Sequence, residues 1–383
     1  MTRFGKGGRS SPHGSTFAQK SAVGLLAAGT FLLTFCWLGI GRAKLQAQGN
    51  DSSARGESPQ ETGESAADAR QFKLMVSGIL DHYFRPPPGR EVVIVCDSEK
   101  SRLAQALVAG LELRRCPARV MLIGANPQSS AQTLREVLDN DHVGLMVLAS
   151  PQMWKELALA DRLEFRERWP SIRARASPVF FDAVTPLPNM LRLYSADPDD
   201  SRQFLASLQQ QLSNDFPVRI VAPGGTDLKF VARRWEIWGW ELLTYPVEET
   251  VSGTIVADAG VFFSKVRAPI RLHVRHGKLI NMECADPNDP VFQQYARWMN
   301  EAHDADPRNW QLAEVGIGGN ANARITDVLM ETEVVRGTCH FCFGDNSMFG
   351  GQHKTTWHGG TVVIHNPRLE VGGRTVALEY HSD

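Results

Sequence analysis

The residues of this sequence that could do chemistry are glutamates and histidines in four segments of its C-terminal half. These segments are Gly239–Pro246 with Glu241, Leu312–Asn320 with Glu314, Gly337–Gly344 with His340, and Gly350–Gly360 with His353 and His358. Imidazoles and carboxylates are the groups with which proteins bind zinc and similar divalent cations. The gaps between these residues match no compact zinc motif, so spacing alone leaves a metal site as a hypothesis.

Other kinds of site are less well supported by the sequence. A single C-x-x-C, Cys339 to Cys342, has no second copy, so we expect a strand with alternating inward residues rather than a zinc ribbon. The G-x-S-x-G motif of serine hydrolases is absent. The 41 Lys and Arg balance 42 Asp and Glu, which argues against a nucleic-acid partner, because phosphate binders usually carry a basic excess.

The elements that must position these side chains change character near residue 224. Beyond it, glycines and prolines are frequent and apolar runs are short, which predicts an α+β domain over residues 224–383 with a mixed or antiparallel sheet. Gly277 reads as a hairpin turn between two of the strands. The expected strands are 254–257, 270–274 and 279–281, and the expected helix is 291–302.

Residues 71–223 read instead as alternating strands and helices. Strands are expected at 91–96, 119–124, 143–148, 178–181 and 218–221, and helices at 101–113, 130–138, 153–169 and 203–212. This order predicts a Rossmann-like, doubly wound parallel sheet, and the whole chain is therefore of the α/β class. The turn after the first strand, Cys96 to Lys100, lacks the glycines of a phosphate-binding loop.

The first seventy residues are not expected to belong to the fold. Residues 1–21 form a basic N-terminal region, and 22–41 form an uncharged apolar run just long enough to cross a bilayer. Residues 42–70 are poor in large apolar side chains and read as a disordered tether. We expect a single membrane anchor; an exported protein with a cleaved signal peptide is an alternative. If translation starts at Met75, the protein is cytoplasmic.

The order and flanking residues of the four segments resemble those of the thermophilic metallo-aminopeptidases, of the aminopeptidase T or leucyl aminopeptidase type. That family also includes the dihydroxypyridine ring-cleaving dioxygenases. The resemblance covers residues from about 75 to 383. It is clearest at Gly225–Leu228, Pro246–Ile255, Glu314–Asn320, Gly337–His340, and the Gly-Gly-x-x-Lys-Thr-x-x-His stretch that ends at His358.

This resemblance implies a homodimeric aminopeptidase that removes N-terminal residues from peptides. Glu241, Glu314, His340 and His358 would hold zinc, cobalt or manganese, and Glu314 would bridge two metals and help to activate water. Two family positions differ. Gly360 stands where the family has an aspartate ligand, and Ser347 stands where it has a catalytic tyrosine. Asp345 or His353 are possible substitutes or neighbours of the site.

Two alternatives stay open at this point. The loss of the aspartate and the tyrosine also fits a non-catalytic family member that binds peptides without cutting them. The ring-cleaving dioxygenases use two histidines and one carboxylate on a single ferrous iron, and His340, His358 and Glu314 could supply that set.

Overall fold

The computed structural model describes residues 66–123, 127–140, 142–148, 168, 179–182, 185–212, 216–262, 264–347, 350–355 and 357–378. The apolar run 22–41 and, apart from Arg168, the expected helix 153–169 lie outside these residues. Among the described residues, no helix combines the length and the apolar character needed to cross a bilayer.

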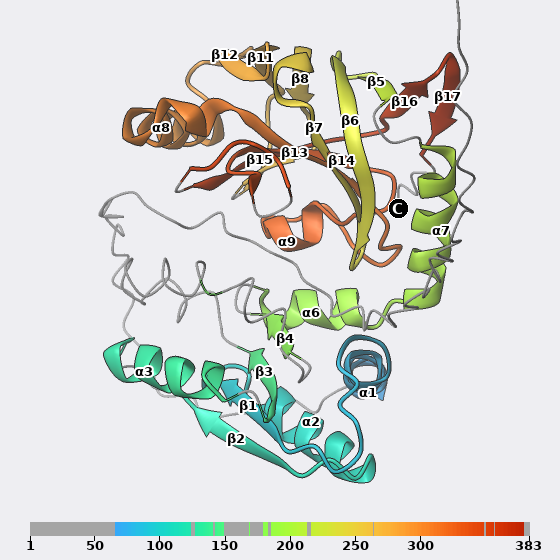
Figure 1. Ribbon diagram of the computed structural model, residues 1–383, viewed down its shortest axis with the longest axis vertical. Helices are drawn as coiled ribbons and strands as arrows, with labels where there is room; N and C mark the ends of the chain where they lie inside the picture. Colours follow the sequence, from blue (N-terminus) through green and yellow to red (C-terminus); the bar gives the residue numbers. More distant parts are fainter. Residues whose placement is uncertain are drawn as a thin grey trace, which may run out of the picture.

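A four-stranded parallel sheet forms the first structural unit, drawn in the lower half of Figure 1. Its strand order is β2-β1-β3-β4. Successive strands are added first on one side of β1 and then on the other, which is the pattern of a doubly wound sheet. The strands are β1 (Val92–Cys96), β2 (Ala118–Leu122), β3 (Gly144–Leu148) and β4 (Val179–Asp182). β1 and β3 are fully buried, which explains why their sequences are continuous apolar runs.

The helices of this half of the chain precede, connect or follow these strands, and the last of them packs Leu205 and Leu208 into the core of the second, larger sheet. They are α1 (Ala66–Gly78), the short π-helix η1 (Ile79–Tyr83), α2 (Ser101–Leu113), α3 (Pro127–Leu138), α6 (Leu187–Tyr194) and α7 (Pro198–Gln211). Helix α2 has the predicted limits, and the residues that gave its helical period, Leu103, Leu107 and Leu111, are all buried. Asp197 caps α7 by accepting a hydrogen bond from the main-chain N–H of Asp199 at 2.9 Å.

A second, larger sheet of thirteen strands fills the upper half of Figure 1. All its strand pairs are antiparallel, as the α+β prediction allowed. The strands are β5 (Phe216–Val221), β6 (Asp227–Trp238), β7 (Glu241–Pro246), β8 (Ser252–Ala257), β9 (Gly260–Val261), β10 (Ser264–Lys265), β11 (Ile270–Arg275), β12 (Lys278–Cys284), β13 (Leu312–Gly318), β14 (Cys339–Gly344), β15 (His358–Ile364), β16 (Arg368–Val371) and β17 (Arg374–Ala377).

Strand β5 belongs to this larger sheet, where it pairs with β6 and β16, although it precedes residue 224. Its inward residues Val218 and Ile220 are buried in the core of the larger sheet. An apolar strand at this place in the chain could extend either sheet. The choice depends on partners about 10 and 150 residues away, which a local pattern does not reveal.

Helix α8 (Pro290–Ala305) covers one face of the larger sheet. Asp289 caps it by accepting hydrogen bonds from the N–H groups of Val291 and Phe292, and Tyr295 and Met299 pack into the core. Three short helices complete the unit: η2 (Glu248–Thr250), η3 (Pro307–Trp310) and α9 (Leu329–Thr332). Figure 1 shows α9 between the larger sheet and α6, on the side that faces the first unit.

The contacts that hold the units together include an aromatic cluster and a buried carboxylate. The Trp240 ring lies in the core of the first unit, 5.3 Å from the Tyr83 ring and 4.9 Å from the Tyr194 ring between centroids. Glu331 of α9 is fully buried and accepts hydrogen bonds from Asn189 and Arg192 of α6. The larger sheet is thus anchored to the first unit beside two of its predicted ligands, Glu241 and His340.

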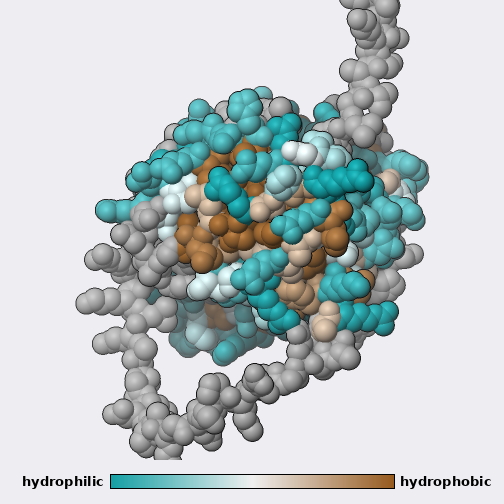
Figure 2. Space-filling view, turned by 90° about the horizontal axis from the view of Figure 1, so that it is seen from below, coloured by the Kyte–Doolittle hydropathy of each residue, from teal (hydrophilic) through white to brown (hydrophobic). Residues whose placement is uncertain are grey.

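Figure 2 shows the molecule from below, where apolar side chains gather near the middle of the face. The exposed apolar residues of the first unit include Leu74 of α1, Leu113 of α2 and Leu122 of β2. Single exposed leucines are common on folded proteins, and these do not by themselves mark an interface.

Candidate metal centre

Four neighbouring strands of the larger sheet bring the predicted ligands together. Glu241 is the first residue of β7, Glu314 lies in β13, His340 in β14, and His358 begins β15. The register pairs Gly318 with Glu241, Gly316 with His340, and Gly344 with His358. Because side chains alternate along a strand, this register puts all four side chains on one face of the sheet.

We call Glu241, Glu314, His340 and His358 the Glu–His cluster; each of the four is at most 6% exposed. The two carboxylate oxygens of Glu314 lie near different imidazoles. Oε1 is 3.2 Å from Nε2 of His340, and Oε2 is 3.6 Å from Nε2 of His358. Oε1 of Glu241 lies 3.8 Å from the same nitrogen of His340. Glu314 therefore lies between two histidines, with Glu241 at the His340 end.

Main-chain carbonyls fix the orientation of both rings. Nδ1 of His340 donates to the carbonyl oxygen of Glu333 at 3.1 Å, and Nδ1 of His358 donates to that of Asp345 at 2.7 Å. A carbonyl can only accept, so the hydrogen of each neutral ring sits on Nδ1 and the lone pair on Nε2. Metal-binding histidines commonly donate their other ring N–H to a carbonyl in this way.

The donor set fits a metal ion. Nε2 lone pairs and carboxylate oxygens face one another in a buried space. Both accept hydrogen bonds and both can bind a metal, so they need a proton or a cation between them. Oε1 of Glu241 is buried and has no hydrogen-bond partner among the described residues. Among the described side chains, His340 is the positive group that acts on Glu241. A cation bound there would supply further positive charge.

Burial and charge shift the pKa values of the cluster. Burial raises the pKa of Glu241 well above its usual value, and it does the same for the neighbouring Glu333. Burial also opposes the charged form of Glu314, but His340 and His358 overcome it and lower the pKa of Glu314. The pKa of His340 is raised by Glu314 and Glu241 despite burial. Cation binding must therefore displace protons and should strengthen as pH rises.

A glycine makes room for the His340 ring. A Cβ at Gly316 would lie 2.1 Å from the ring atoms Cε1 and Nε2 of His340, so no larger residue fits across the strand pair. This close approach gives one physical reason for the glycines in the Glu314–Asn320 segment.

Two further residues adjoin the cluster: Cys342, which the sequence predicted only as part of a strand, and Glu333, which it did not indicate. Sγ of Cys342 lies 3.7 Å from Oε1 of Glu314, and the ligand-type atoms of Glu314, His340 and Cys342 all lie within 4.8 Å of one another. The signal was present: Cys342 follows His340 by two, so a strand places both on one face. Glu333 acts through its main-chain carbonyl, which no sequence pattern marks.

The other residues considered as substitutes lie in the loop between β14 and β15. The Asp345 carboxylate accepts hydrogen bonds from Ser347 and from the N–H of Thr355, so it shapes the loop, and Asp345 reaches His358 through its carbonyl. Ser347 is exposed. The half-buried His353 contacts Asn346 through its main-chain N–H, and burial lowers its pKa.

Gly360, the residue at the family aspartate position, lies in a β-bulge. The β14–β15 register pairs Phe341 with Val362 and Phe343 with Gly359, so Cys342 alone opposes Gly360 and Thr361. Gly360 has a φ of +64°, and a Cβ there would lie 2.6 Å from Sδ of Met299. The bulge directs the Thr361 hydroxyl to Cys342 instead, with Oγ1 3.1 Å from Sγ. Position 360 is thus closed to a larger side chain.

Restoring the aspartate by a Gly360→Asp substitution is therefore expected to destabilise the protein rather than to complete the cluster. We expect the free energy of unfolding to fall by about 1–3 kcal/mol, from the strained φ and the overlap with Met299. Gly373→Asp is the matched control, because Gly373 has a φ of +75° with no atom near a Cβ. Denaturant unfolding measures both variants; a fully stable Gly360→Asp protein with one extra cation per chain would contradict the expectation.

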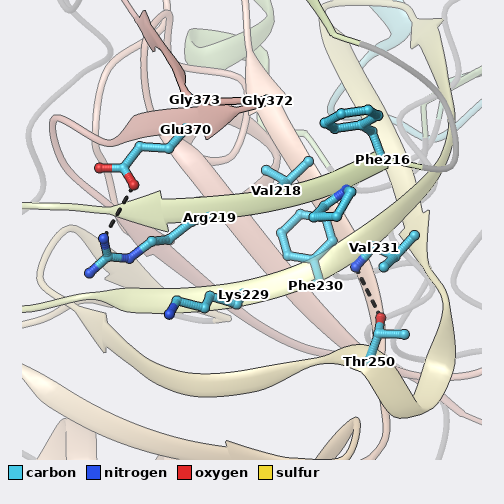
Figure 3. Close-up of a pocket in the computed structure, with 11 residues that line it drawn as sticks. Phe216, Val218, Arg219, Lys229, Phe230, Val231, Thr250, Glu370, Gly372 and Gly373 are labelled. Carbon is cyan, nitrogen blue, oxygen red and sulfur yellow. Dashed lines mark hydrogen bonds and ion pairs between the residues drawn. The ribbon is translucent and has the colours of Figure 1, made fainter.

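A pocket of about 450 Å³ lies elsewhere on the larger sheet (Figure 3). Its apolar lining includes Phe216, Val218 and Phe230, and none of the Glu–His cluster lines it. The Arg219 guanidinium at its edge is already paired with Glu370 and Asp227. The lining of this pocket therefore lacks a group of histidines and carboxylates like that of the Glu–His cluster.

Comparison with known proteins was consistent with this geometry. The model of the 2,5-dihydroxypyridine 5,6-dioxygenase family, NicX, matches residues 87–377. The chain belongs to this family. The NicX match spans both structural units and all four cluster residues, and it confirms the resemblance drawn from the sequence motifs. A search of curated proteins gave no match.

Among solved structures, this NicX-family chain is similar to wild-type AmpT, an aminopeptidase T from Thermus thermophilus. The TM-score is 0.55 at 14% identity, over 82% of this chain and 98% of AmpT. At this identity the similarity establishes the fold. The family match indicates an enzyme, and with the Glu–His cluster it indicates a metal whose type is open.

Proposed function

We propose that the chain is a metal-dependent hydrolase of the aminopeptidase type, which removes N-terminal residues from peptides. The observation that carries the proposal is the position of Glu314. Its two oxygens lie near different imidazoles, 3.2 Å from His340 and 3.6 Å from His358. A carboxylate placed in this way suits a bridge between two cation positions better than one corner of a single-ion triad.

The residues around these positions have distinct roles in the proposal. Glu241, Glu314 and His340 form one ligand group, and His358 with the second oxygen of Glu314 forms the other. A bound divalent cation would polarise the scissile carbonyl and lower the pKa of water. Glu314 would accept the proton of the attacking water, because its lowered pKa keeps it ionised.

The two groups are unequal. The first has three side chains, whereas the second lacks the carboxylate that Gly360 replaces. We therefore expect one cation per chain to bind tightly and a second to bind weakly or not at all. The expected partners, a peptide substrate and a second copy of the chain, remain part of the proposal.

A ring-cleaving dioxygenase with one ferrous ion is the second candidate, and the family match favours it. His340, His358 and Glu314 contain the two imidazoles and one carboxylate that such an ion uses. In this case one ion would bind all three side chains.

Metal analysis of the purified full-length chain separates these candidates. We expect about one zinc, cobalt or manganese ion per chain, and hydrolysis of unblocked short peptides but not of N-acetylated ones. The His340→Ala, His358→Ala double variant should lose both the ion and the hydrolysis.

The other outcomes are informative. One iron per chain, with oxygen consumption on 2,5-dihydroxypyridine, would replace the hydrolase proposal with the dioxygenase. A bound metal without turnover of either substrate class, but with peptide binding, would identify a non-catalytic member. No metal after reconstitution would refute both enzyme proposals.

A further inference from the structure

The Glu–His cluster contains one donor that its expected ligand set does not include. Cys342 lies on the same face of β14 as His340, is 3% exposed, and has its Sγ 3.7 Å from Oε1 of Glu314. This is the oxygen that also faces Nε2 of His340, at 3.2 Å. Three different ligand atoms, a carboxylate oxygen, an imidazole nitrogen and a sulfur, thus surround one point.

We propose that Cys342 is a thiolate ligand of the metal held by Glu241, Glu314 and His340, and that it restricts this site to thiophilic cations such as zinc or cobalt. The inference rests on the proposed metal site and deepens it. It predicts a single centre built by Glu314, His340 and Cys342, with Glu241 as the fourth ligand.

The separations between these atoms agree with such a centre. Bonds of about 2.0–2.3 Å to oxygen, nitrogen and sulfur place neighbouring ligands of a tetrahedral ion about 3.3–3.5 Å apart. The corresponding distances here are 3.2 Å and 3.7 Å. Oε1 of Glu241 lies 3.8 Å from Nε2 of His340.

Glu241 provides the independent sign that a ligand belongs here. It is 6% exposed, and its Oε1 is buried without a hydrogen-bond partner among the described residues. A buried carboxylate oxygen left in this way is costly unless a cation completes its surroundings. The oxygen lies near the same histidine nitrogen that is 3.2 Å from Oε1 of Glu314.

The β-bulge brings a second polar group to the cysteine. Gly360 takes the extra position in β15, and Thr361 then stands opposite Cys342, with the hydroxyl 3.1 Å from the sulfur. When the thiol releases its proton to solvent on metal binding, the hydroxyl can donate to the sulfur. A thiolate there would add a negative charge to the ligand group of Glu241, Glu314 and His340.

The metal preference follows from the sulfur of Cys342. Thiolates favour zinc, cobalt and other soft or borderline ions, whereas carboxylates and water suit magnesium, calcium and manganese. A centre with Cys342 among its ligands should bind zinc far better than manganese.

Cobalt absorption spectroscopy on the full-length chain tests the inference. We expect one Co²⁺ per chain, with a thiolate-to-cobalt charge-transfer band in the near ultraviolet beside the visible bands of the ion. Cys342→Ser should lose this band and weaken cobalt binding by at least about 100-fold. Even the loss of a group that only hydrogen-bonds a ligand lowers metal affinity by about 10–100-fold. Cys339→Ser is the matched control, because Cys339 lies on the opposite, core-facing side of the same strand; it should keep the band.

The failures are distinguishable. Visible cobalt bands without the charge-transfer band in the wild-type protein would refute the thiolate ligand and leave the proposed function intact. A band that survives in Cys342→Ser and disappears in Cys339→Ser would also refute it. No cobalt binding at all, by absorption and by elemental analysis, would refute both the ligand and the proposed metal site.

Discussion

Replacing His340 with asparagine is expected to weaken metal binding by at least about 100-fold and to reduce hydrolysis by a similar factor at limiting metal. The shorter side chain removes the Nε2 lone pair that faces Glu314 at 3.2 Å and Glu241 at 3.8 Å. It also removes the imidazole that lies next to both buried carboxylates. Competition against a zinc chelator measures the affinity, and circular dichroism shows that the variant is folded.

The control is the same substitution at an exposed histidine. His276 lies at the turn between β11 and β12 with a φ of +48°, a backbone conformation that asparagine tolerates well. His276→Asn should bind metal like the wild-type protein. Equal metal affinity in His340→Asn and His276→Asn would remove His340 from the proposed centre.

A Glu331→Gln substitution is expected to lower the free energy of unfolding by about 3–5 kcal/mol. Glu331 is fully buried and accepts hydrogen bonds from Asn189 at 2.6 Å and from two nitrogens of Arg192 at 2.7 Å. The N–H of Arg324 and the hydroxyl of Thr326 point to it as well. A glutamine amide presents N–H groups to some of these donors and leaves Arg192 without its charged partner.

The same substitution should weaken metal binding several-fold, because Glu331 is close to Glu333, whose carbonyl orients His340. Glu112→Gln provides the control, since Glu112 is exposed on α2 and should change stability by less than about 0.5 kcal/mol. Denaturant titration gives the stabilities. A Glu331→Gln protein as stable as the Glu112→Gln control would show that the contact between the units contributes little.

Much of the fold could be predicted from local patterns where these reflect burial. The continuous apolar run at Val92–Cys96 became a strand buried on both faces, and the period of Leu103, Leu107 and Leu111 predicted α2 with its observed limits. The long strand β6 was not predicted. Its two arginines, Arg233 and Arg234, interrupt the alternation at a register shift against β7. Such irregularities are set by the neighbouring strands and leave little local signal.

The site could be predicted in part for a similar reason. The motifs pointed to Glu241, Glu314, His340 and His358, which the strand register then places on one face. The position of Thr361 opposite Cys342 depends on a bulge, and the supporting carbonyls of Glu333 and Asp345 belong to the backbone. Neither is encoded by residue type, so spacing alone could not predict them.

Trp240 and Glu241 are consecutive residues with different neighbours: the indole packs between Tyr83 and Tyr194 of the first unit, and the carboxylate faces His340. A cation held by Glu241 would therefore also restrain the joint between the two units. Thermodynamic linkage makes the effect reciprocal, because whatever favours the docked arrangement raises cation affinity by the same factor. At a free cation concentration of about 100 times Kd, binding would add about 2.7 kcal/mol to the stability of the docked form. The supply of metal would then control how long the molecule stays assembled and resists proteases, as well as how fast it turns over.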